Sequence, residues 1–144
     1  MKILILNGPN MNLLGLREPE IYGRETYEDL VALAEKTCRE VGLEAVCVQS
    51  NHEGVLIDEI QNAYGVCGGI VINPAGYTHT SIAIADALRA VDLPAVEVHI
   101  SDTDAREPFR RISYTADACC KVIKGQGLDG YRQAILYLKS LTEK

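Results

Sequence analysis

Three stretches of the sequence gather side chains suited to binding and transforming a small polar molecule. The first runs from Asn7 to Gly23 and the second from Asn73 to Ser81. The third runs from Glu97 to Ser101, with arginines close behind. Asparagine, histidine, tyrosine and arginine side chains bind hydroxyl and carboxylate groups well. The candidate residues in these stretches are Asn10, Arg17, Tyr22, Asn73, His79, His99, Arg106 and Arg110.

A tyrosine accompanied by arginines is the candidate for base chemistry. A free phenol has a pKa of about 10 and is a poor base at neutral pH. Tyr22 becomes a useful base only if guanidinium groups stabilise its ionised form, and Arg17, Arg106 and Arg110 are the candidates for that role. The alternative interpretations are that Tyr22 is a packing residue and that the arginines are solvated at the surface.

Each histidine and asparagine also has a purely structural interpretation. His79 precedes a predicted helix and fits a helix cap, whereas His99 follows an apolar strand and fits a buried, hydrogen-bonded core residue. Asn10 and Asn73 lie beside glycine or proline and fit turn positions. For His52 we favour capping. No single residue identifies a site, and the hypothesis depends on their convergence.

Composition narrows the possible partners. The 144 residues carry a net charge of -6, so the overall surface is not expected to bind nucleic acid or acidic lipid. Arg106, Arg110 and Arg111 cluster in one short stretch and indicate a positive pocket within a negative surface. No apolar run is long enough to span a bilayer. The opening run Ile3–Leu6 is too short for a signal peptide.

The cysteines indicate a reducing compartment. Their odd number and the absence of CxxC or Cys/His ligand spacing argue against a disulfide framework and a zinc site. Most lie in apolar runs and are expected to be small buried hydrophobes. We therefore expect a cytoplasmic protein. The five residues are Cys38, Cys47, Cys67, Cys119 and Cys120.

Short apolar runs alternate with helix-period segments along the chain. The predicted strands are Lys2–Leu6, Ala45–Val48, Gly69–Ile72, Ala95–Val98 and Cys119–Ile123. The predicted helices cover Tyr27–Val41, Leu56–Ala63, Ile82–Val91 and Leu128–Leu141, with a short one over Phe109–Tyr114. Thr26 and Asp29 form a predicted capping pair, and Gly42 is placed to end the same helix.

Near-continuous apolar strands indicate a parallel sheet covered on both faces. We expect one α/β domain over residues 1–144, with a doubly wound, flavodoxin-like strand order of 2-1-3-4-5. In such a sheet ligands bind beyond the carboxyl ends of the strands, where the three polar stretches would converge. The connection Asn7–Gly23 is longer than the roughly 2–6 residues usual for a strand-to-helix loop, which predicts a binding loop or lid.

The same three stretches resemble the type II 3-dehydroquinate dehydratase family, and the resemblance covers essentially the whole chain. Three long blocks in the right order are more specific than a single glycine motif. The matching segments are Asn7–Asn10 with Arg17–Gly23, Asn73–Ser81, Glu97–Ser101 with Arg106 and Phe109–Arg111, and the ending Gly125–Gly127 with Tyr131.

The resemblance implies dehydration of 3-dehydroquinate to 3-dehydroshikimate, in the shikimate or quinate pathway, without metal or cofactor. Tyr22 would remove a proton from carbon 2 to give an enolate, and His99 would protonate the departing hydroxyl in an anti elimination. Arg17 would stabilise transition-state charge, and Arg106 would hold Tyr22 ionised. Asn10 would orient a water against the enolate oxygen.

The resemblance also implies a substrate-binding set and an assembly. Asp86 matches a position that contacts the site from a neighbouring subunit, and family members assemble as trimers, commonly four to a dodecamer. Ala85 departs from the family because arginine is often found there. The residues implied to hold substrate hydroxyls and carboxylate are Asn73, His79, Ile100, Ser101 and Arg110.

Three other functions fit parts of the pattern less well. An FMN-binding electron carrier would need a Ser/Thr-rich loop after the first strand, but Asn7–Gly15 has neither residue and the chain has no Trp. A receiver-type signalling domain would need acidic residues where Asn7 and Asn73 stand. A Schiff-base dehydratase would need a buried lysine, for which Lys121 and Lys124 are the interior candidates.

Overall fold

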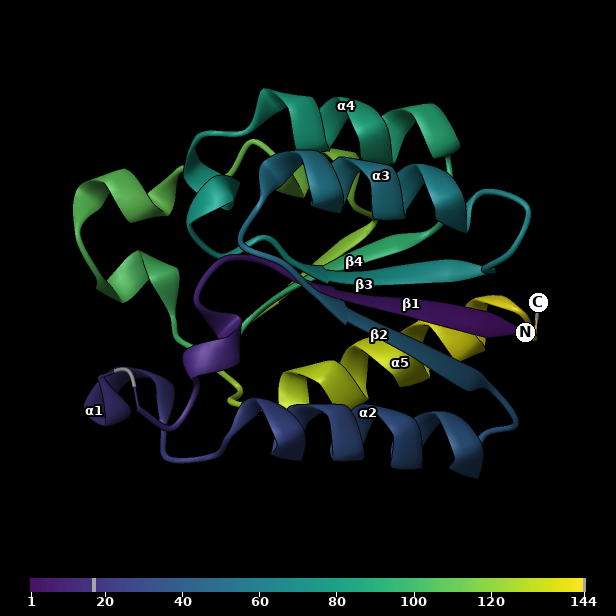
Figure 1. The fold of residues 1–144 in the computed structure, drawn as a ribbon, viewed down its shortest axis with the longest axis horizontal. Helices are drawn as coiled ribbons and strands as arrows, with labels where there is room; N and C mark the ends of the chain where they lie inside the picture. The colour runs from purple at the N-terminus through teal and green to yellow at the C-terminus, as the bar shows by residue number, and fades with distance from the viewer. Residues whose placement is uncertain (17, 144) are drawn as a thin grey trace.

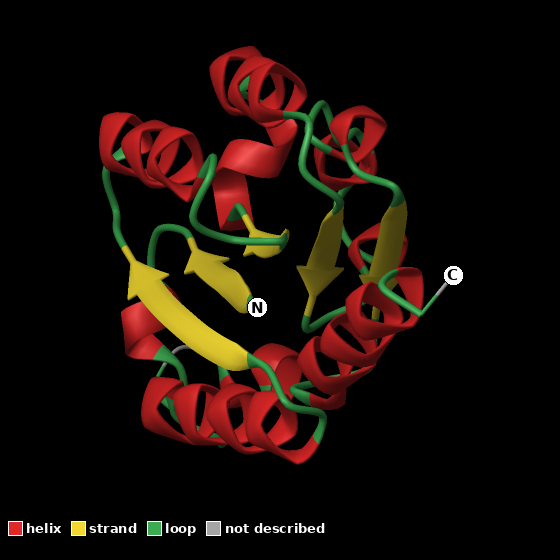
Figure 2. Ribbon diagram, turned by 90° about the vertical axis from the view of Figure 1, so that its right-hand side faces the viewer, coloured by secondary structure: helices red, strands yellow, loops and turns green. Residues whose placement is uncertain are grey.

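Five parallel strands form one twisted sheet with helices on both faces (Figure 1, Figure 2). The computed structural model describes residues 1–16 and 18–143, and of Tyr22 it describes the backbone only. The strand order is β2-β1-β3-β4-β5, and neighbouring strands are parallel. The predicted α/β class and its flavodoxin-like order are therefore confirmed.

The elements alternate along the chain as expected. The strands are β1 (Lys2–Asn7), β2 (Glu44–Gln49), β3 (Gly69–Asn73), β4 (Ala95–His99) and β5 (Lys121–Lys124). The α-helices are α1 (Pro19–Tyr22), α2 (Tyr27–Glu40), α3 (Glu53–Ala63), α4 (Ile82–Val91) and α5 (Asp129–Leu141). Short 3-10 helices are η1 (Met11–Leu13), η2 (Ala75–His79), η3 (Thr103–Ala105), η4 (Pro108–Arg111) and η5 (Ala116–Ala118). Helices α3 and α4 cover one face of the sheet, and α2 and α5 cover the other (Figure 1).

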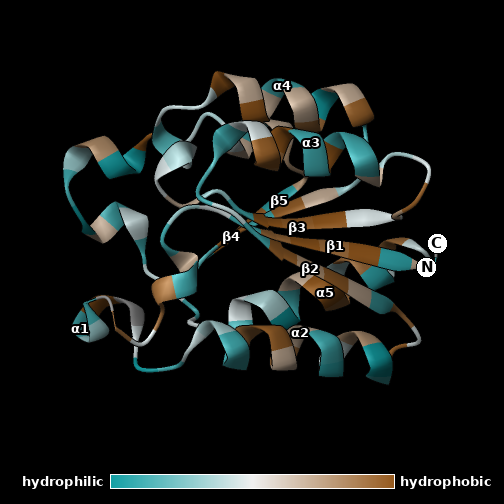
Figure 3. Ribbon diagram, viewed as in Figure 1, coloured by the Kyte–Doolittle hydropathy of each residue, from teal (hydrophilic) through white to brown (hydrophobic). Residues whose placement is uncertain are grey.

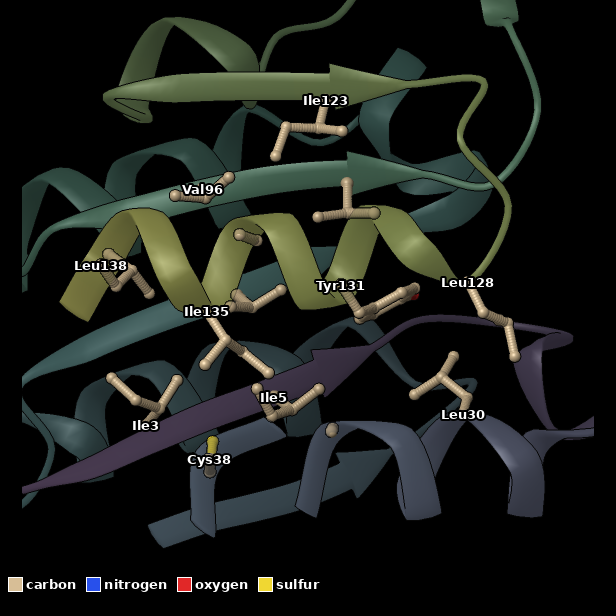
Figure 4. Close-up of a cluster of buried hydrophobic side chains, with 14 of the residues drawn as sticks. Ile3, Ile5, Leu30, Cys38, Val96, Ile123, Leu128, Tyr131, Ile135 and Leu138 are labelled. Carbon is tan, nitrogen blue, oxygen red and sulfur yellow. The ribbon is translucent and has the colours of Figure 1, made fainter. Parts of the chain in front are cut away.

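The sheet separates two hydrophobic cores. Successive side chains of a strand point to opposite faces, so Ile3 and Ile5 pack toward α2 and α5, whereas Leu4 and Leu6 pack toward α3 and α4. Figure 4 shows the first core, where Ile135 of α5 lies beside Ile5. The strands are accordingly apolar along most of their length (Figure 3). Each such buried side chain contributes roughly 1.5–3 kcal/mol.

Residues close to each end of α2 determine where the helix begins and ends. The Thr26 hydroxyl accepts a hydrogen bond from the Asp29 backbone N–H at 3.2 Å, and the Asp29 carboxylate accepts one from the Thr26 backbone N–H at 2.9 Å. Gly42 has a φ of 76°, the left-handed conformation that ends helices. The predicted capping pair and helix stop are confirmed. His52 occupies the N-cap position of α3, but its side chain makes no capping hydrogen bond, so that prediction is wrong for the imidazole.

The fifth strand begins later than predicted. It starts at Lys121, because Cys119 and Cys120 complete the turn after η5, where the Cys119 backbone N–H bonds back to the Ala116 carbonyl. The expectation that most cysteines are buried is also wrong. Only Cys38 is fully buried among the five; Cys120 is exposed, and the other three are intermediate.

The predicted short helix over Phe109–Tyr114 forms only as η4, which ends at Arg111. Ile112 is already extended, with a φ of -86° and a ψ of 128°. Pro108 suits the first turn of a helix, but the segment is too short to bury an apolar face. This early ending leaves residues 112–115 as an irregular stretch that reaches back toward β4.

The connections after the strands gather at one end of the sheet. In Figure 1 α1 and the segment that follows β4 (green) lie at this end, and both termini lie at the other. Within residues 1–16 and 18–143, none of the helices has the length and apolarity that a transmembrane span needs. The carboxyl edge of the sheet is therefore where the polar stretches meet.

Candidate active site

A pocket of about 240 Å³ opens at the carboxyl ends of β1, β3 and β4. It is lined by polar side chains from the three stretches that the sequence singled out, together with small and apolar residues that shape its wall. The sequence-predicted residues in the lining are Asn10, Asn73, His79, His99, Ile100, Ser101, Arg106 and Arg110. The other lining residues are Pro9, Met11, Ala75, Gly76 and Thr103.

Three predicted site residues are not among these lining residues. Arg17 and the Tyr22 side chain lie outside the described part of the chain. Asp86 lies on α4 with its side chain 71% exposed, and its carboxylate is 3.6 Å from the Arg89 guanidinium. It does not line the pocket of its own chain. Arg111, expected to add to the positive pocket, is exposed and likewise does not line it.

The first loop is held against the second by a close backbone contact. The Gly8 backbone N–H donates to the Asn73 carbonyl at 2.8 Å. Asn10 adopts a left-handed conformation with a φ of 70°, and its backbone N–H donates to the Asn51 side chain at 3.0 Å. Met11 is buried and joins the pocket wall to the core on the α2–α5 side of the sheet. Asn10 is therefore both a turn residue, as its structural interpretation held, and part of the pocket wall.

A buried hydrogen-bond network fixes Asn73. Its side-chain oxygen accepts from the Ala75 backbone N–H at 3.0 Å, and its side-chain nitrogen donates to the Tyr131 hydroxyl at 3.1 Å. The Tyr131 hydroxyl in turn donates to the Asn7 side-chain oxygen at 2.5 Å. Burial raises the pKa of Tyr131, so the phenol stays protonated and keeps this donor. The network joins the ends of β1 and β3 to α5.

His79 lies in η2 and is not a helix cap, because Ser81 caps α4 through its hydroxyl. The Nδ1 atom of His79 is 2.6 Å from the Ile112 carbonyl oxygen. A carbonyl can only accept, so Nδ1 carries a proton, and in the neutral form of the ring Nε2 is then the acceptor. In that form His79 can accept a hydrogen bond from a ligand hydroxyl.

His99 forms a buried pair with Glu97, two residues earlier on the same face of β4. The Nε2 atom of His99 is 2.8 Å from Glu97 Oε2, and neither side chain is more than 7% exposed. Burial alone would raise the pKa of Glu97. The hydrogen bond and charge of His99, with the hydroxyls of Thr115 and Ser113, outweigh that effect and hold the pKa below its ordinary value. Glu97 is therefore a carboxylate, and His99 donates to it through Nε2.

Two arginines in the pocket lining lie beside acidic residues. The Arg106 guanidinium lies 4.0 Å from the Glu18 carboxylate and 3.9 Å from that of Glu107. Arg110 donates to Glu107 at 2.7 Å and lies over the Phe109 ring, 5.2 Å from its centroid. A guanidinium has five N–H donors, so the Arg110 side chain retains donors for an anionic ligand.

Sequence reasoning missed the residues behind the pocket. Glu97 had a usable signal, because a glutamate inside an apolar strand two residues before a histidine places both side chains on one face. Ser113, Thr115 and Tyr131 had no such signal as site residues, since their partners are distant in the chain. Within the described part of the chain, no group of three or more His, Cys, Asp or Glu side chains is arranged to hold a metal ion.

A doubly wound parallel sheet with arginine, histidine and asparagine side chains around a pocket at its switch point is the arrangement of an α/β protein suited to binding a small polar anion. Comparison with known proteins narrows this class. The sequence profile of the class II dehydroquinase family matches residues 1–139. The chain therefore belongs to the class II dehydroquinase family and is an enzyme of that family.

Individual relatives agree along nearly the whole chain. A 3-dehydroquinate dehydratase of Corynebacterium glutamicum (strain R) is 56% identical over 140 residues, 97% of each chain. One from Clostridium acetobutylicum is 51% identical over 144 residues, covering both chains completely. The crystal structure of a type II dehydroquinase from Butyrivibrio crossotus superposes with a TM-score of 0.94 at 54% identity, covering 96% of this chain and 97% of the other. These matches do not favour an FMN carrier or a receiver domain.

Proposed function

We propose that this protein, as a single catalytic domain over residues 1–144, dehydrates 3-dehydroquinate to 3-dehydroshikimate through an enolate. The observation that carries the proposal is the buried His99–Glu97 pair in the wall of a pocket that also contains Arg106 and Arg110, in a chain of this family. An acid beside cationic donors suits the elimination of water from a carboxylate-bearing substrate. The proposed steps use side chains and water alone.

Tyr22 is the proposed base. A proton alpha to a ketone is weakly acidic, so its removal needs a strong base and a stabilised enolate. The Glu18–Arg106 ion pair brings the start of α1 to a residue of the pocket lining, and Tyr22 ends that helix. Cationic Arg106 and Arg17 would lower the phenol pKa and stabilise transition-state charge. Asn10 would orient a water toward the enolate oxygen.

His99 is the proposed acid for the departing hydroxyl. Because Nε2 donates to Glu97, the proton delivered to the leaving group comes from Nδ1 of the imidazolium. The leaving hydroxide and this proton form water, while Tyr22 holds the proton taken from carbon 2. That proton returns to His99 through solvent before the next turnover. The negative Glu97 stabilises the imidazolium that begins each cycle.

The remaining pocket residues would hold the substrate. Arg110 and the Ile100–Ser101 segment suit its carboxylate and hydroxyls, and His79 suits a hydroxyl through Nε2. Asn73 would contribute from its fixed position between β1 and β3. We further propose a cytoplasmic homo-oligomer, a dodecamer built from four trimers, acting in the shikimate or quinate pathway. In this assembly Asp86 of one subunit would complete the site of another.

The first test is the assay of purified protein with 3-dehydroquinate, following the absorbance of the conjugated enone product. Wild-type protein should be active, and Tyr22→Phe should lose about 10²- to 10⁴-fold in kcat, the range of general acid–base catalysis. Tyr64→Phe is the matched control, because Tyr64 is 70% exposed at the end of α3. Full activity in Tyr22→Phe would require another base.

A Schiff-base route to the same product has its own test. A Schiff-base route needs a buried lysine in the pocket. Lys121 and Lys124 are not buried and do not line the pocket, so neither of them meets this need. Borohydride added during turnover should leave no substrate adduct in the intact-protein mass. A stable adduct would overturn the tyrosinate mechanism.

A further inference from the structure

Residues 112–115 do not line the pocket, but they contact His79 directly and reach His99 through its partner Glu97. The Ile112 carbonyl accepts the Nδ1 proton of His79. The Tyr114 backbone N–H donates to the Thr78 carbonyl at 2.9 Å, which ties the segment to η2. The side chains of Ser113 and Thr115 reach Glu97, the partner of His99. One short segment therefore braces both imidazoles from behind.

Only one assignment of donors and acceptors fits the hydroxyls of Thr78, Ser113 and Thr115. A carboxylate can only accept, and each hydroxyl has one proton, so Ser113 and Thr115 both donate to Glu97. Ser113 Oγ lies 2.9 Å from Glu97 Oε2, and Thr115 Oγ1 bonds Oε1. Thr78 Oγ1 lies 3.3 Å from Thr115 Oγ1, so Thr78 is left to donate to Thr115. Ser113 Oγ accepts from the Ala116 backbone N–H at 3.0 Å.

Glu97 depends on these donors because it is completely buried. A buried carboxylate is stable only when hydrogen bonds and opposite charge replace water. The groups facing it are His99 from β4, Ser113 and Thr115 from residues 112–115, and Cys119 from the turn before β5. Burial, and after it the Glu97 charge, raises the pKa of the Cys119 thiol, which therefore stays neutral. The hydroxyls supply the stabilisation of Glu97 that does not come from His99.

We propose that Thr115, assisted by Ser113, is a positioning residue for the reaction: its hydroxyl holds Glu97 as an oriented carboxylate, so that the proton shared by the pair stays on His99. The inference rests on the proposed function of His99 as the general acid. Without the hydroxyl, the proton is drawn toward Glu97. The imidazole then becomes neutral and cannot protonate a leaving hydroxide.

The experiment compares Thr115→Val, which keeps the shape and removes the donor, with Thr115→Ser, which keeps the donor. Thr115→Val should lower kcat at least tenfold, part of the 10²- to 10⁴-fold that a general acid contributes. KM should change by less than about twofold, because the residue does not line the pocket. Thr115→Ser should retain most of the activity. Ser113→Ala, a second loss of a donor to Glu97, should lower kcat in the same direction.

Two readouts separate positioning from general disruption. In a His99→Ala background, Thr115→Val should have little further effect on kcat, because residues that act as a unit are not additive. An NMR titration of the His99 ring should report a changed pKa in Thr115→Val and a wild-type value in Thr115→Ser. The proposal is overturned if Thr115→Val and Thr115→Ser are equally impaired, if the loss persists in full without His99, or if the His99 titration is unchanged. The titration needs no substrate, so it tests the positioning role even if the proposed reaction is wrong. An inactive wild-type enzyme would instead refute the proposed function.

Discussion

At the scale of single residues, the pocket depends on groups that never reach its surface. Glu97 is fully buried in β4, and it remains ionised because His99, Thr115 and Ser113 all donate to it. The Asn73 side chain is held by Tyr131 and by the Ala75 backbone. Hydrogen bonds from buried neighbours therefore hold His99 and Asn73 in fixed positions in the pocket wall.

The ionised state of Glu97 predicts a specific dependence of stability on pH. Its pKa is lower in the folded than in the unfolded protein, so its contribution is fully present above the ordinary glutamate pKa of about 4.3 and is lost as the pH falls through the lower folded value. Urea unfolding should therefore show that wild type loses more stability than Glu97→Gln between pH 7 and pH 3.5. Glu25→Gln, at an exposed position, should parallel wild type. Parallel curves for all three proteins would mean that Glu97 is not held ionised by the fold.

At the scale of elements, the site depends on how closely the loops after β1 and β3 approach each other. The two strands are aligned so that Asn7 pairs with Asn73. Immediately beyond them, a Cβ atom on Gly8 would lie 2.5 Å from the Pro74 carbonyl oxygen. Only glycine allows this contact, because backbone cannot move aside as a flexible side chain can. The close approach brings Asn10 and Asn73 into one wall.

Replacing Gly8 by alanine should separate these loops. We expect Gly8→Ala to destabilise the protein by about 1–3 kcal/mol, as overpacking does, and to raise KM because the pocket wall shifts. Gly54→Ala is the matched control, since a Cβ there meets no atom within 4 Å and the residue lies in the first turn of α3. Its stability should be unchanged or slightly higher. Chemical denaturation and steady-state kinetics measure both effects, and equal behaviour of the two variants would contradict the steric argument.

At the scale of the whole molecule, the surface has an acidic residue and apolar side chains that have no role within a single chain. Asp86 is exposed on α4, away from the pocket that it is proposed to serve. Large apolar side chains near the pocket are also exposed, with Ile82 and Phe109 each at 59% and Ile112 at 54%. Apolar surface of this kind favours contact with another subunit. Both observations support the proposed oligomer, in which Asp86 acts across an interface.

Mixed oligomers test this arrangement. Asp86→Ala and Tyr22→Phe should each be strongly impaired alone, because every site then lacks one component. After the two proteins are unfolded together and refolded, sites with Tyr22 from one chain and Asp86 from its neighbour should restore about a quarter of wild-type activity for random assembly. The same mixture without unfolding is the control. No recovery would show that Asp86 does not act between chains, and sedimentation would give the size of the assembly.

Much of this architecture was predictable because it depends on local patterns. Periods of two and 3.6 residues in hydrophobicity placed the strands and main helices, and the polar stretches at strand ends indicated the edge where the pocket lies. The capping pair Thr26–Asp29 was likewise a local signal. The errors occurred where pattern was weak, as in the short segment after Pro108 and at the start of β5, since segments of a few residues take their conformation from their surroundings.

The sequence by itself therefore determined the fold class, the strand order and most of the pocket lining. Only the tertiary structure decided which groups support that lining. Tyr131 meets Asn7 across 124 positions, and Thr115 meets Glu97 across 18. Such pairs have no periodicity and no fixed spacing. They exist because packing the helices and loops against the sheet buries polar groups, and these groups are stable there when they bond to the side chains that the fold brings beside them.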